Sequence, residues 1–427
     1  MFLVIMALAL MMYGLALWAW RSPAELVAYD MLMRMRLDSH PRPDLAIVAL
    51  DRKTIDELGG LPWSRATHAR ILRALRNGGA KYVVYDILLD APDTEHPGAD
   101  RAFWSVLTEK KNAYLPIVYD PLKTPEWDPS DIRALIYMER YAISERISYP
   151  DGTPFYRYYY FTPPWADFVS AANGVGVDVG EGMGDGVARS VRLAYLTRIR
   201  YPVPSKLLPI DITLPQLTDR LVVLPGLPLI SACGIFDVEK VRVQVQFGRS
   251  IDLLAELYPS VDIPIDDNGD MLVNYIGPVG SFPTYSAIDL LQGKIDDTAL
   301  DGKTVFVGVT DNTIPPAMLT TPYGKMPKVE VTANAVSTIL SRSYITRTQR
   351  EALAVLLILG VLLGLMLPLI NRWDLGPTAI AISLVYIVLA VVVLSVFGHA
   401  LPLIPAVLLI LLGSAAAALL KPLMFNM

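Results

Sequence analysis

The chain has 427 residues, of which 53% are hydrophobic, and a formal net charge of −5 at pH 7. Nearly all of its charge lies between residues 21 and 350, and this region has no basic stripe of the kind that nucleic-acid phosphates require. The composition therefore argues against nucleic acid as a partner. Cys233 is the only cysteine, so no disulfide can form within the chain.

The amino-terminal segment is apolar. Residues 2–20 contain no charged side chain, and they are long enough for a helix to cross a hydrocarbon core of about 30 Å. A cleaved signal peptide would normally begin with a charged region, which this segment lacks. Trp18, Trp20 and Arg21 instead suit an anchor at the membrane surface. We therefore expect residues 1–21 to form a retained transmembrane helix.

Three more apolar segments follow the charged region, at residues 352–370, 375–397 and 401–420. They predict three transmembrane helices within residues 351–421, followed by a short cytoplasmic tail at 422–427. The charged side chains of Arg372 and Lys421 are expected on the cytoplasmic side. The chain is then a multi-pass membrane protein, with both termini in the cytoplasm and residues 22–350 outside it.

The charged region, residues 22–350, is large enough for a soluble domain with its own core. It begins with a predicted helix at 22–37. Two near-continuous apolar runs, 46–50 and 82–85, then predict strands buried on both faces. The segment 66–77 between them predicts a helix, because its apolar residues recur on one face. A strand, a crossover helix and a second strand form a right-handed unit with parallel strands.

Later segments extend this pattern. Further strands are predicted at 113–120 and 304–311, and a buried helix at 225–236. The dipeptide 268–269, Asn-Gly, lies between apolar runs and predicts a β-hairpin. The glycine-rich segment 173–186 lacks the spacing of a phosphate-binding loop, so we expect a hairpin or a loop there.

Together these elements predict an α/β domain outside the cytoplasm, with a mixed, largely parallel sheet flanked by helices. Four transmembrane α-helices accompany it, one before the domain and three after. Residues 121–164 mix proline, tyrosine and charged residues, and we interpret them as an insertion that decorates the sheet. Residues 329–340 fit either a strand or the start of a helix that leads back to the membrane.

Two aspartates, Asp51 and Asp86, directly follow the first two predicted strands. The carboxyl ends of parallel strands form the edge where ligands usually bind in such sheets. We therefore predict a ligand-binding pocket from Asp51, Arg65, Asp86, Asp90, Thr310 and Asp311. Carboxylates and an arginine could hold a cation or a polar ligand, or do acid–base work. The alternative is a structural network, in which Asp51 and Asp86 cap neighbouring loops and pair with Arg65.

Neither a nucleophile nor a set of metal ligands accompanies this pocket in the sequence. The four histidines show no ligand spacing such as HExxH. His96 lies among Asp93, Glu95 and Asp100 and could hold a metal, but a solvated loop is the simpler interpretation. We therefore expect no catalytic residue, no metal site and no cofactor, and we do not expect an enzyme.

Seven stretches occur in order along the domain: AIVALDRKTIDELGGLPWSR at 46–65, GAKYVVYDILLD at 79–90, DGVARSVRL at 185–193, LVNYIGP at 272–278, TYSAIDLLQGK at 284–294, GKTVFVGVTD at 302–311 and TPYGKMPKVEVTANAVSTIL at 321–340. With them the domain resembles the CHASE type-two sensor, an extracellular module of bacterial and cyanobacterial histidine kinases and nucleotide cyclases. One span before the domain and three after it are also similar to the layout of that family. The resemblance implies a location in a bacterial inner (plasma) membrane.

Two departures from the family pattern bear on the ligand. Where the family usually has MPGVEIHAN, this chain has MPKVEVTAN, so Lys328 and Thr332 replace a glycine and a histidine. After Thr310 the family usually carries a further aspartate before TP, whereas this chain has TIPPAMLTTP. The resemblance thus implies a sensor domain that binds a different ligand from its relatives, or none.

Three hypotheses for the function remain open. The first is a membrane-anchored sensory or regulatory protein that binds a ligand or partner outside and acts through a separate protein, because only residues 421–427 follow the last span. The second is a structural subunit of a membrane or envelope complex that retains the sensor fold without sensing. The third is a hydrolase using Asp51 and Asp86, for which we find no third catalytic group. Besides the lipid bilayer, we expect a homo-oligomer or a hetero-complex with a membrane partner that carries the output.

Overall fold

A computed structural model describes residues 7, 10, 11, 13, 14, 22–36, 40–96, 98–120, 139–157, 160–180, 185–199, 220–238, 242–254, 259–296, 298–314, 317–347 and 349–425. The chain divides into two compact units. We call the first, residues 1–39 and 345–427, the membrane unit, and the second, residues 40–344, the domain.

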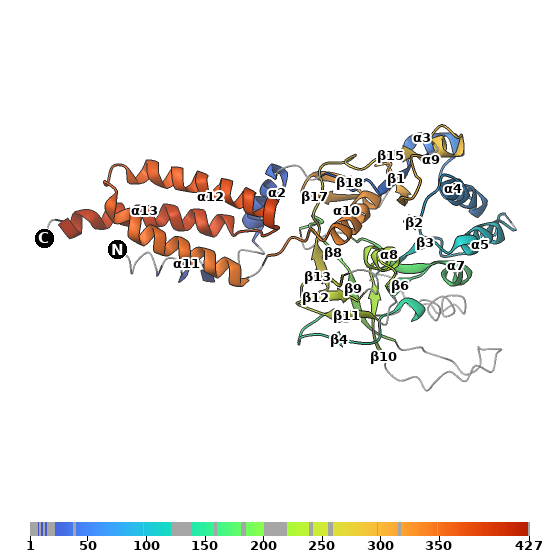
Figure 1. The fold of residues 1–427 in the computed structure, drawn as a ribbon, viewed down its shortest axis with the longest axis horizontal. Helices are drawn as coiled ribbons and strands as arrows, with labels where there is room; N and C mark the ends of the chain where they lie inside the picture. Colours follow the sequence, from blue (N-terminus) through green and yellow to red (C-terminus); the bar gives the residue numbers. More distant parts are fainter. Residues whose placement is uncertain are drawn as a thin grey trace. The chain divides into compact units, whose positions relative to one another are not determined.

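The centre of the domain is a seven-stranded sheet (Figure 1). Its strands lie in the order β15 (Thr284–Ser286), β1 (Leu45–Leu50), β16 (Thr304–Val309), β2 (Tyr82–Tyr85), β3 (Ala113–Tyr119) and β6 (Phe161–Thr162), with β7 (Gly174–Val177) also paired to β3. Strand β6 is antiparallel to β3, whereas the other pairs in this sheet are parallel. The predicted mixed, largely parallel sheet is therefore confirmed. The first two predicted strands are parallel, but β16 lies between them.

Helices cover both faces of this sheet: α3 (Arg52–Leu58), α4 (Arg65–Asn77), α5 (Ala99–Lys110), α7 (Ala166–Ala171), α8 (Leu227–Ile235), α9 (Ala287–Leu291) and α10 (Lys328–Ser341). Val48 and Tyr85 pack with apolar residues of α4, α5 and α7. Their chain neighbours Ile47 and Val84 pack on the opposite face, with α8 and α10. Successive side chains of a strand point to opposite faces. Burial of both faces explains why β1 and β2 are apolar throughout.

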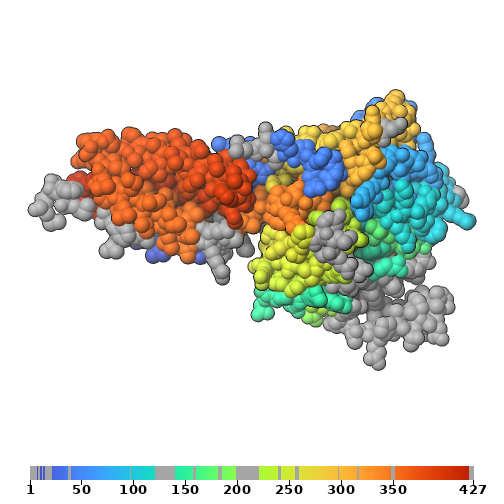
Figure 2. Space-filling model, in the orientation of Figure 1, coloured from blue at the N-terminus to red at the C-terminus, as the bar shows by residue number. Residues whose placement is uncertain are grey.

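Helix α4 confirms the helix predicted between the first two strands. It lies beside α5, and the two are visible in blue and cyan at the surface in Figure 2. Ile71, Leu72 and Leu75 are fully buried, as their spacing predicts. Gly79 follows with a φ of +83°, and an ideal Cβ there would lie 2.4 Å from Oδ1 of Asp301. Glycine is therefore required where the chain turns into β2.

Four smaller sheets complete the described part of the domain. Their strands are β10 (Arg220–Pro225), β9 (Ala194–Ile199) and β5 (Tyr156–Arg157); β13 (Val261–Pro264), β12 (Ser250–Leu253), β11 (Val243–Gln246) and β4 (Ile147–Ser148); β14 (Asp270–Leu272) and β8 (Ser190–Arg192); and β17 (Met318–Thr321) and β18 (Gly324–Pro327). The predicted insertion, 121–164, contributes β4, β5, β6 and the short helix η1 (Glu139–Tyr141). Its residues 121–138 lie outside the described part of the chain.

The β-hairpin predicted about residues 268–269 is wrong. A tight turn is present, and the N–H of Gly269 donates to the carbonyl of Asp266 at 3.0 Å. The strands on either side nevertheless join different sheets, since β13 pairs with β12 and β14 pairs with β8. An ideal Cβ at Gly269 would lie 2.4 Å from the carbonyl oxygen of Ala194. A glycine is therefore needed here both for the turn and for the close approach of the Ala194 backbone.

The loop or hairpin expected at 173–186 is also wrong for its first residues, because 174–177 form the buried strand β7. An ideal Cβ at Gly174 would lie 2.8 Å from Cγ1 of Ile230, and one at Gly176 would lie 2.8 Å from Cα of Leu227. Helix α8 thus packs directly on the backbone of β7. The glycines reflect this close approach rather than flexibility.

The membrane unit contains α2 (Pro23–Met35), α11 (Gln349–Met366), η4 (Leu367–Leu369), α12 (Leu375–Phe397) and α13 (Leu403–Phe425). Among the described residues, three stretches are long and apolar enough to cross a membrane: Ala352–Leu369, Leu375–Phe397 and Leu403–Pro422. They agree closely with the three predicted spans that follow the domain. Most of the predicted first span, 2–20, lies outside the described residues.

Candidate functional site

The carboxyl edge of the parallel sheet gathers acidic residues from several strands. Asp51 follows β1, Asp311 lies two residues after β16, Asp86 follows β2, and Asp178 follows β7. Because these strands are parallel, their carboxyl ends meet at one edge. The carboxylates belong to two groups: a groove that includes Asp51 and Asp311, and a charged cluster that includes Asp86 and Asp178.

Asp51 is the N-cap residue of α3. Its Oδ1 accepts hydrogen bonds from the backbone N–H of Thr54 at 2.9 Å, from Oγ1 of Thr54 at 2.6 Å and from Oγ of Ser286 at 2.9 Å. A carboxylate in this position satisfies backbone donors that a helix start leaves unpaired. Asp51 therefore holds α3 against β15, which is the structural role considered for it from the sequence.

A groove of about 500 Å³ opens beside this cap. Its wall includes Asp51, Arg52, Thr310, Asp311 and Glu330. The groove thus contains three carboxylates and one guanidinium. This excess of negative charge favours a ligand that carries positive charge.

Within the groove, Asp311 has one satisfied and one unsatisfied oxygen. Oδ1 accepts from the backbone N–H and from Oγ1 of Thr313, both at 2.8 Å, and these bonds hold the pKa of Asp311 below its usual value. Oδ2 is buried, and no hydrogen-bond partner for it exists among the described residues. Its nearest cation, Nη1 of Arg52, is 3.9 Å away. Asp311 is therefore an ionised carboxylate that keeps one buried oxygen without a hydrogen-bond donor among the described residues.

The charged cluster consists of Asp86, Asp178 and Lys328. Nζ of Lys328 donates a hydrogen bond to Oδ2 of Asp178, and its charge also acts on Asp86. Oδ1 of Asp86 is buried without a hydrogen-bond partner among the residues described. Lys328 is the first residue of α10. The helix start can lie close to the sheet because Gly308 of β16 has no side chain, and an ideal Cβ there would lie 2.7 Å from Cβ of Val329.

Burial governs the protonation of this cluster. It raises the pKa of Asp178 to about 6, although the charge of Lys328 works in the opposite direction. Burial likewise raises the pKa of Asp86 against the influence of Lys328. For Lys328, burial lowers the pKa, but the two carboxylates outweigh it and leave the pKa above its ordinary value. One cation thus faces two carboxylates, and such a group shares its protons as a unit.

Arg65, predicted to belong to the pocket, contacts a different loop. Its Nη2 donates to the carbonyl of Ala91 at 2.7 Å, and its Nε lies 3.9 Å from Oδ1 of Asp100. Among the described contacts, none joins Arg65 to Asp51 or Asp86. Asp90 is exposed at the start of the same loop. The structure therefore brings together Asp51, Thr310 and Asp311, and places Arg65 with the loop that follows Asp90.

A model of one family matches residues 3–367 of the chain, under the description CHASE2 domain. This covers well over half of the sequence. The chain belongs to the CHASE2 domain family. Searches of curated proteins and of solved structures gave no match. The resemblance noted from seven ordered stretches is thereby confirmed.

Two residues of the CHASE2 domain that matter to this edge were not predicted from its sequence as site residues. Asp178 follows a four-residue strand of alternating glycine and valine, a pattern that gave no strand signal. Lys328 was noted as a departure from the family pattern, but nothing in the sequence indicated that it pairs with Asp178. An acidic residue directly after a short apolar run would have been the available signal for Asp178.

Within the described part of the chain, no group of three His, Cys, Asp or Glu side chains is placed to hold a metal ion. His96 contacts Asp93 instead, with 3.0 Å between its Nδ1 and Oδ1 of Asp93. The hydroxyls of Thr54 and Ser286 both serve the Asp51 cap. The groove with Asp311 is therefore the part of this edge best suited to a small ligand.

Proposed function

We propose that this chain is a bacterial membrane-anchored sensory or regulatory protein, whose CHASE2 domain lies outside the cytoplasm and binds a small cationic ligand in the groove that contains Asp311. The observation that carries the proposal is the unsatisfied, buried Oδ2 of Asp311 in a groove rich in carboxylates. A buried carboxylate oxygen without a donor costs free energy that a bound ammonium group would recover. In this proposal, no residue of the chain has a catalytic role.

The proposed binding of a cationic ligand is tested with the full chain in neutral detergent, using spermidine as the probe. We expect spermidine to raise the unfolding temperature of the wild type, because it binds the folded state. Asp311→Asn should abolish most of this rise. Asp151→Asn removes an equal charge from an exposed turn and should leave the rise unchanged. Equal responses of the two variants, or none in the wild type, would overturn the assignment of the groove.

The orientation in the membrane is tested by cysteine labelling in the Cys233→Ala background. Lys294→Cys places a thiol on the exposed surface of the domain, and Asn371→Cys places one in the exposed connector between α11 and α12. A membrane-impermeant maleimide should label position 294 in cells with a permeabilised outer layer, and position 371 only after the inner membrane is opened. The reverse pattern would refute an extracytoplasmic domain.

We further propose that the output is delivered by a separate membrane protein. In support, Ile380, Leu384 and Val388 of α12 are exposed apolar side chains that a helix of a partner could contact. A photo-crosslinking residue at Ile380, which is 60% exposed on α12, should capture such a partner, whereas one at the buried Ala379 should not. Crosslinks only between copies of this chain would contradict the separate partner.

A further inference from the structure

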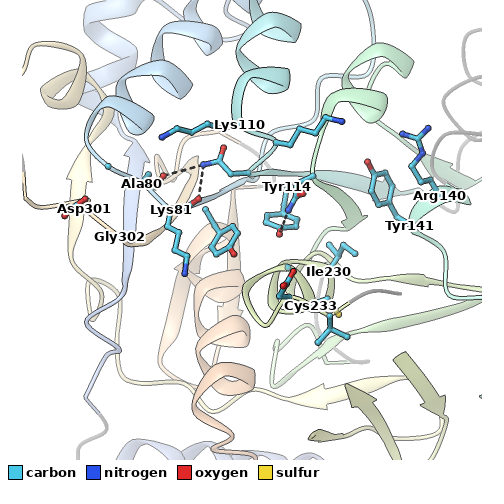
Figure 3. Close-up of a pocket in the computed structure, with 18 residues that line it drawn as sticks. Ala80, Lys81, Lys110, Tyr114, Arg140, Tyr141, Ile230, Cys233, Asp301 and Gly302 are labelled. Carbon is cyan, nitrogen blue, oxygen red and sulfur yellow. Dashed lines mark hydrogen bonds between the residues drawn. The ribbon is translucent and has the colours of Figure 1, made fainter. Parts of the chain in front are cut away.

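A second hollow lies at the amino edge of the sheet, opposite the groove with Asp311. Its volume is about 960 Å³, and its walls come from the segments that lead into β2, β3 and β7, together with η1 and α8 (Figure 3). It shares no lining residue with the groove with Asp311. We propose that this hollow is a binding site for a small organic polyanion, a proposal that does not depend on the function proposed for the groove.

The charge of the hollow is the first argument. Four cationic side chains line it, from Lys81, Lys110, Lys111 and Arg140, against two carboxylates, from Asp237 and Asp301. All four cations are exposed. Among the described residues, no ion pair joins Lys81, Lys110 or Lys111 to a carboxylate. An excess of cationic over anionic side chains in a concave surface creates a field that attracts anions.

The hydrogen bonds already made in the hollow are the second argument, because they use the amide groups and leave the lysine ammonium groups as donors. Asn112 is fully used: its Oδ1 accepts from Nη2 of Arg76 at 2.8 Å, and its Nδ2 donates to the carbonyl of Lys81 at 2.9 Å. The hydroxyl of Tyr114 accepts a bond of 2.5 Å from Nδ2 of Asn173. The donors left for a ligand are therefore the lysine ammonium groups.

The third argument is that the floor is apolar and fixed in place. The ring of Tyr114 is buried, and the ring of Tyr82 lies 6.3 Å from it, centre to centre. An ideal Cβ at Gly234 would lie 1.6 Å from Oη of Tyr114, and one at Gly174 would lie 2.9 Å from its Cδ1. The Tyr114 ring thus occupies the space that two side chains would otherwise fill. The partly exposed ring of Tyr82, packed beside it, is the aromatic face that a ligand with a flat body can contact.

The arrangement of the cations indicates the shape of the ligand. In Figure 3, Lys81 and Arg140 lie on opposite sides of Tyr114, and Lys110 lies above it. A ligand with anionic groups on two sides of a flat core matches this arrangement. The ligand class is therefore a polycarboxylate or a phosphate ester with a flat core.

The test uses the full chain in neutral detergent at low ionic strength, with benzene-1,3,5-tricarboxylate and inorganic pyrophosphate as probes, followed by titration calorimetry. The double variant Lys110→Gln/Lys111→Gln removes two charges from the hollow. The double variant Lys294→Gln/Lys325→Gln removes two charges from exposed positions outside it. We expect the Kd to rise at least about tenfold in the first and to stay within about twofold of the wild type in the second, because charge-assisted bonds are lost only in the first.

The two probes distinguish the sources of negative charge. Binding of the tricarboxylate, weakened by Tyr82→Leu, would establish a site for flat polycarboxylates. Binding of pyrophosphate alone would establish a site for phosphate groups. Equal Kd values in the two double variants, or the absence of saturable binding of either probe to the wild type, would overturn the proposal.

Discussion

The carboxylate of Glu25 accepts a hydrogen bond of 2.8 Å from the backbone N–H of Leu403, 378 positions further along the chain. Its second oxygen accepts from the N–H of Ile404, also at 2.8 Å. Glu25 lies on α2 and is 2% exposed. It therefore caps the start of α13, because these N–H groups have no partner within that helix.

We expect Glu25→Ala to lower the free energy of unfolding by about 2–3 kcal/mol, since two buried backbone donors lose their acceptor. Glu25→Gln retains one acceptor and should lose roughly half as much. The measurement is denaturant unfolding of the full chain in detergent. Asp374→Asn, at the exposed start of α12, is the control and should have little effect. Equal stability of all three variants would show that the cap is not needed.

Lys328→Met should be among the most destabilising changes in the domain. It removes the cation that faces Asp86 and Asp178, and breaking a buried charge pair costs about 3–5 kcal/mol. The neighbouring Lys325→Met, on an exposed position, should cost little. If repulsion between carboxylates is the cause, adding Asp178→Asn to Lys328→Met should restore part of the loss. Unfolding curves that show no such recovery would point to another cause.

The raised pKa of Asp178, about 6 against an ordinary 3.8, makes a pH dependence predictable. The folded state binds this proton more tightly than the unfolded chain does. The resulting stabilisation is complete below about pH 3.8 and is lost as the pH rises through about 6. A pKa difference of this size corresponds to about 3 kcal/mol.

We therefore expect the unfolding free energy of Asp178→Asn to fall less than that of the wild type between pH 4 and pH 7. The measurement is denaturant unfolding of the full chain at intervals across that range. Asp151→Asn, in an exposed turn, should follow the wild-type profile. Parallel profiles for the wild type and Asp178→Asn would contradict the assignment of the titrating group.

Two substitutions test the role of Asp51 as the N-cap residue of α3. Asp51→Ala should cost about 1–2 kcal/mol of stability, because Thr54 and Ser286 lose their acceptor. Asp51→Asn keeps an oxygen in place and should stay near the wild type, since asparagine is an equally good N-cap residue. Thermal unfolding of both variants checks this. A loss in Asp51→Asn as large as in Asp51→Ala would mean that the negative charge itself is required.

Gly234→Ala should destabilise the domain by about 1–3 kcal/mol, because the new methyl group would overlap the hydroxyl of Tyr114. In the Tyr114→Phe background this oxygen is absent, so the same substitution should cost less. A double-mutant cycle on denaturant unfolding measures the coupling. Gly60→Ala, where no atom lies within 4 Å of the added carbon, is the control. Additive effects of the first two changes would argue against the predicted overlap.

Much of the main sheet was predictable because its central strands are buried on both faces. The apolar runs at β1, β2 and β16 are long enough to stand out, and α4 between β1 and β2 has a clear apolar stripe. Strand β7 was missed because glycine carries no strand signal. Its glycines are needed because a side chain at either position would overlap Tyr114, Ile230 or the backbone of α8. The false hairpin has a similar cause. A glycine is needed at position 269 because the backbone of Ala194 lies too close for a side chain, and no local sequence pattern reveals this contact.

The candidate site was predictable in position but not in pairing. A carboxylate that follows a parallel strand lies at the carboxyl edge of the sheet. Asp51, Asp86 and Asp311 all lie at this edge. Which side chain meets which depends on loops and helix starts that come from distant parts of the sequence. Lys328 pairs with Asp178, which lies 150 positions earlier in the chain. Arg65 instead donates a hydrogen bond to the carbonyl of Ala91, in a nearby loop.

The placement of β1 has a consequence for how the protein is made. Its hydrogen-bonded neighbours in the sheet are β15 and β16, and Val48 pairs with Tyr285 and with Val307. A ribosome that adds about 5–20 residues per second needs roughly 12–50 seconds to reach these partners. Pairing at such sequence separation is slow, and the waiting strand is prone to aggregation. We expect the nascent chain to depend on chaperones until the last third of the domain has emerged.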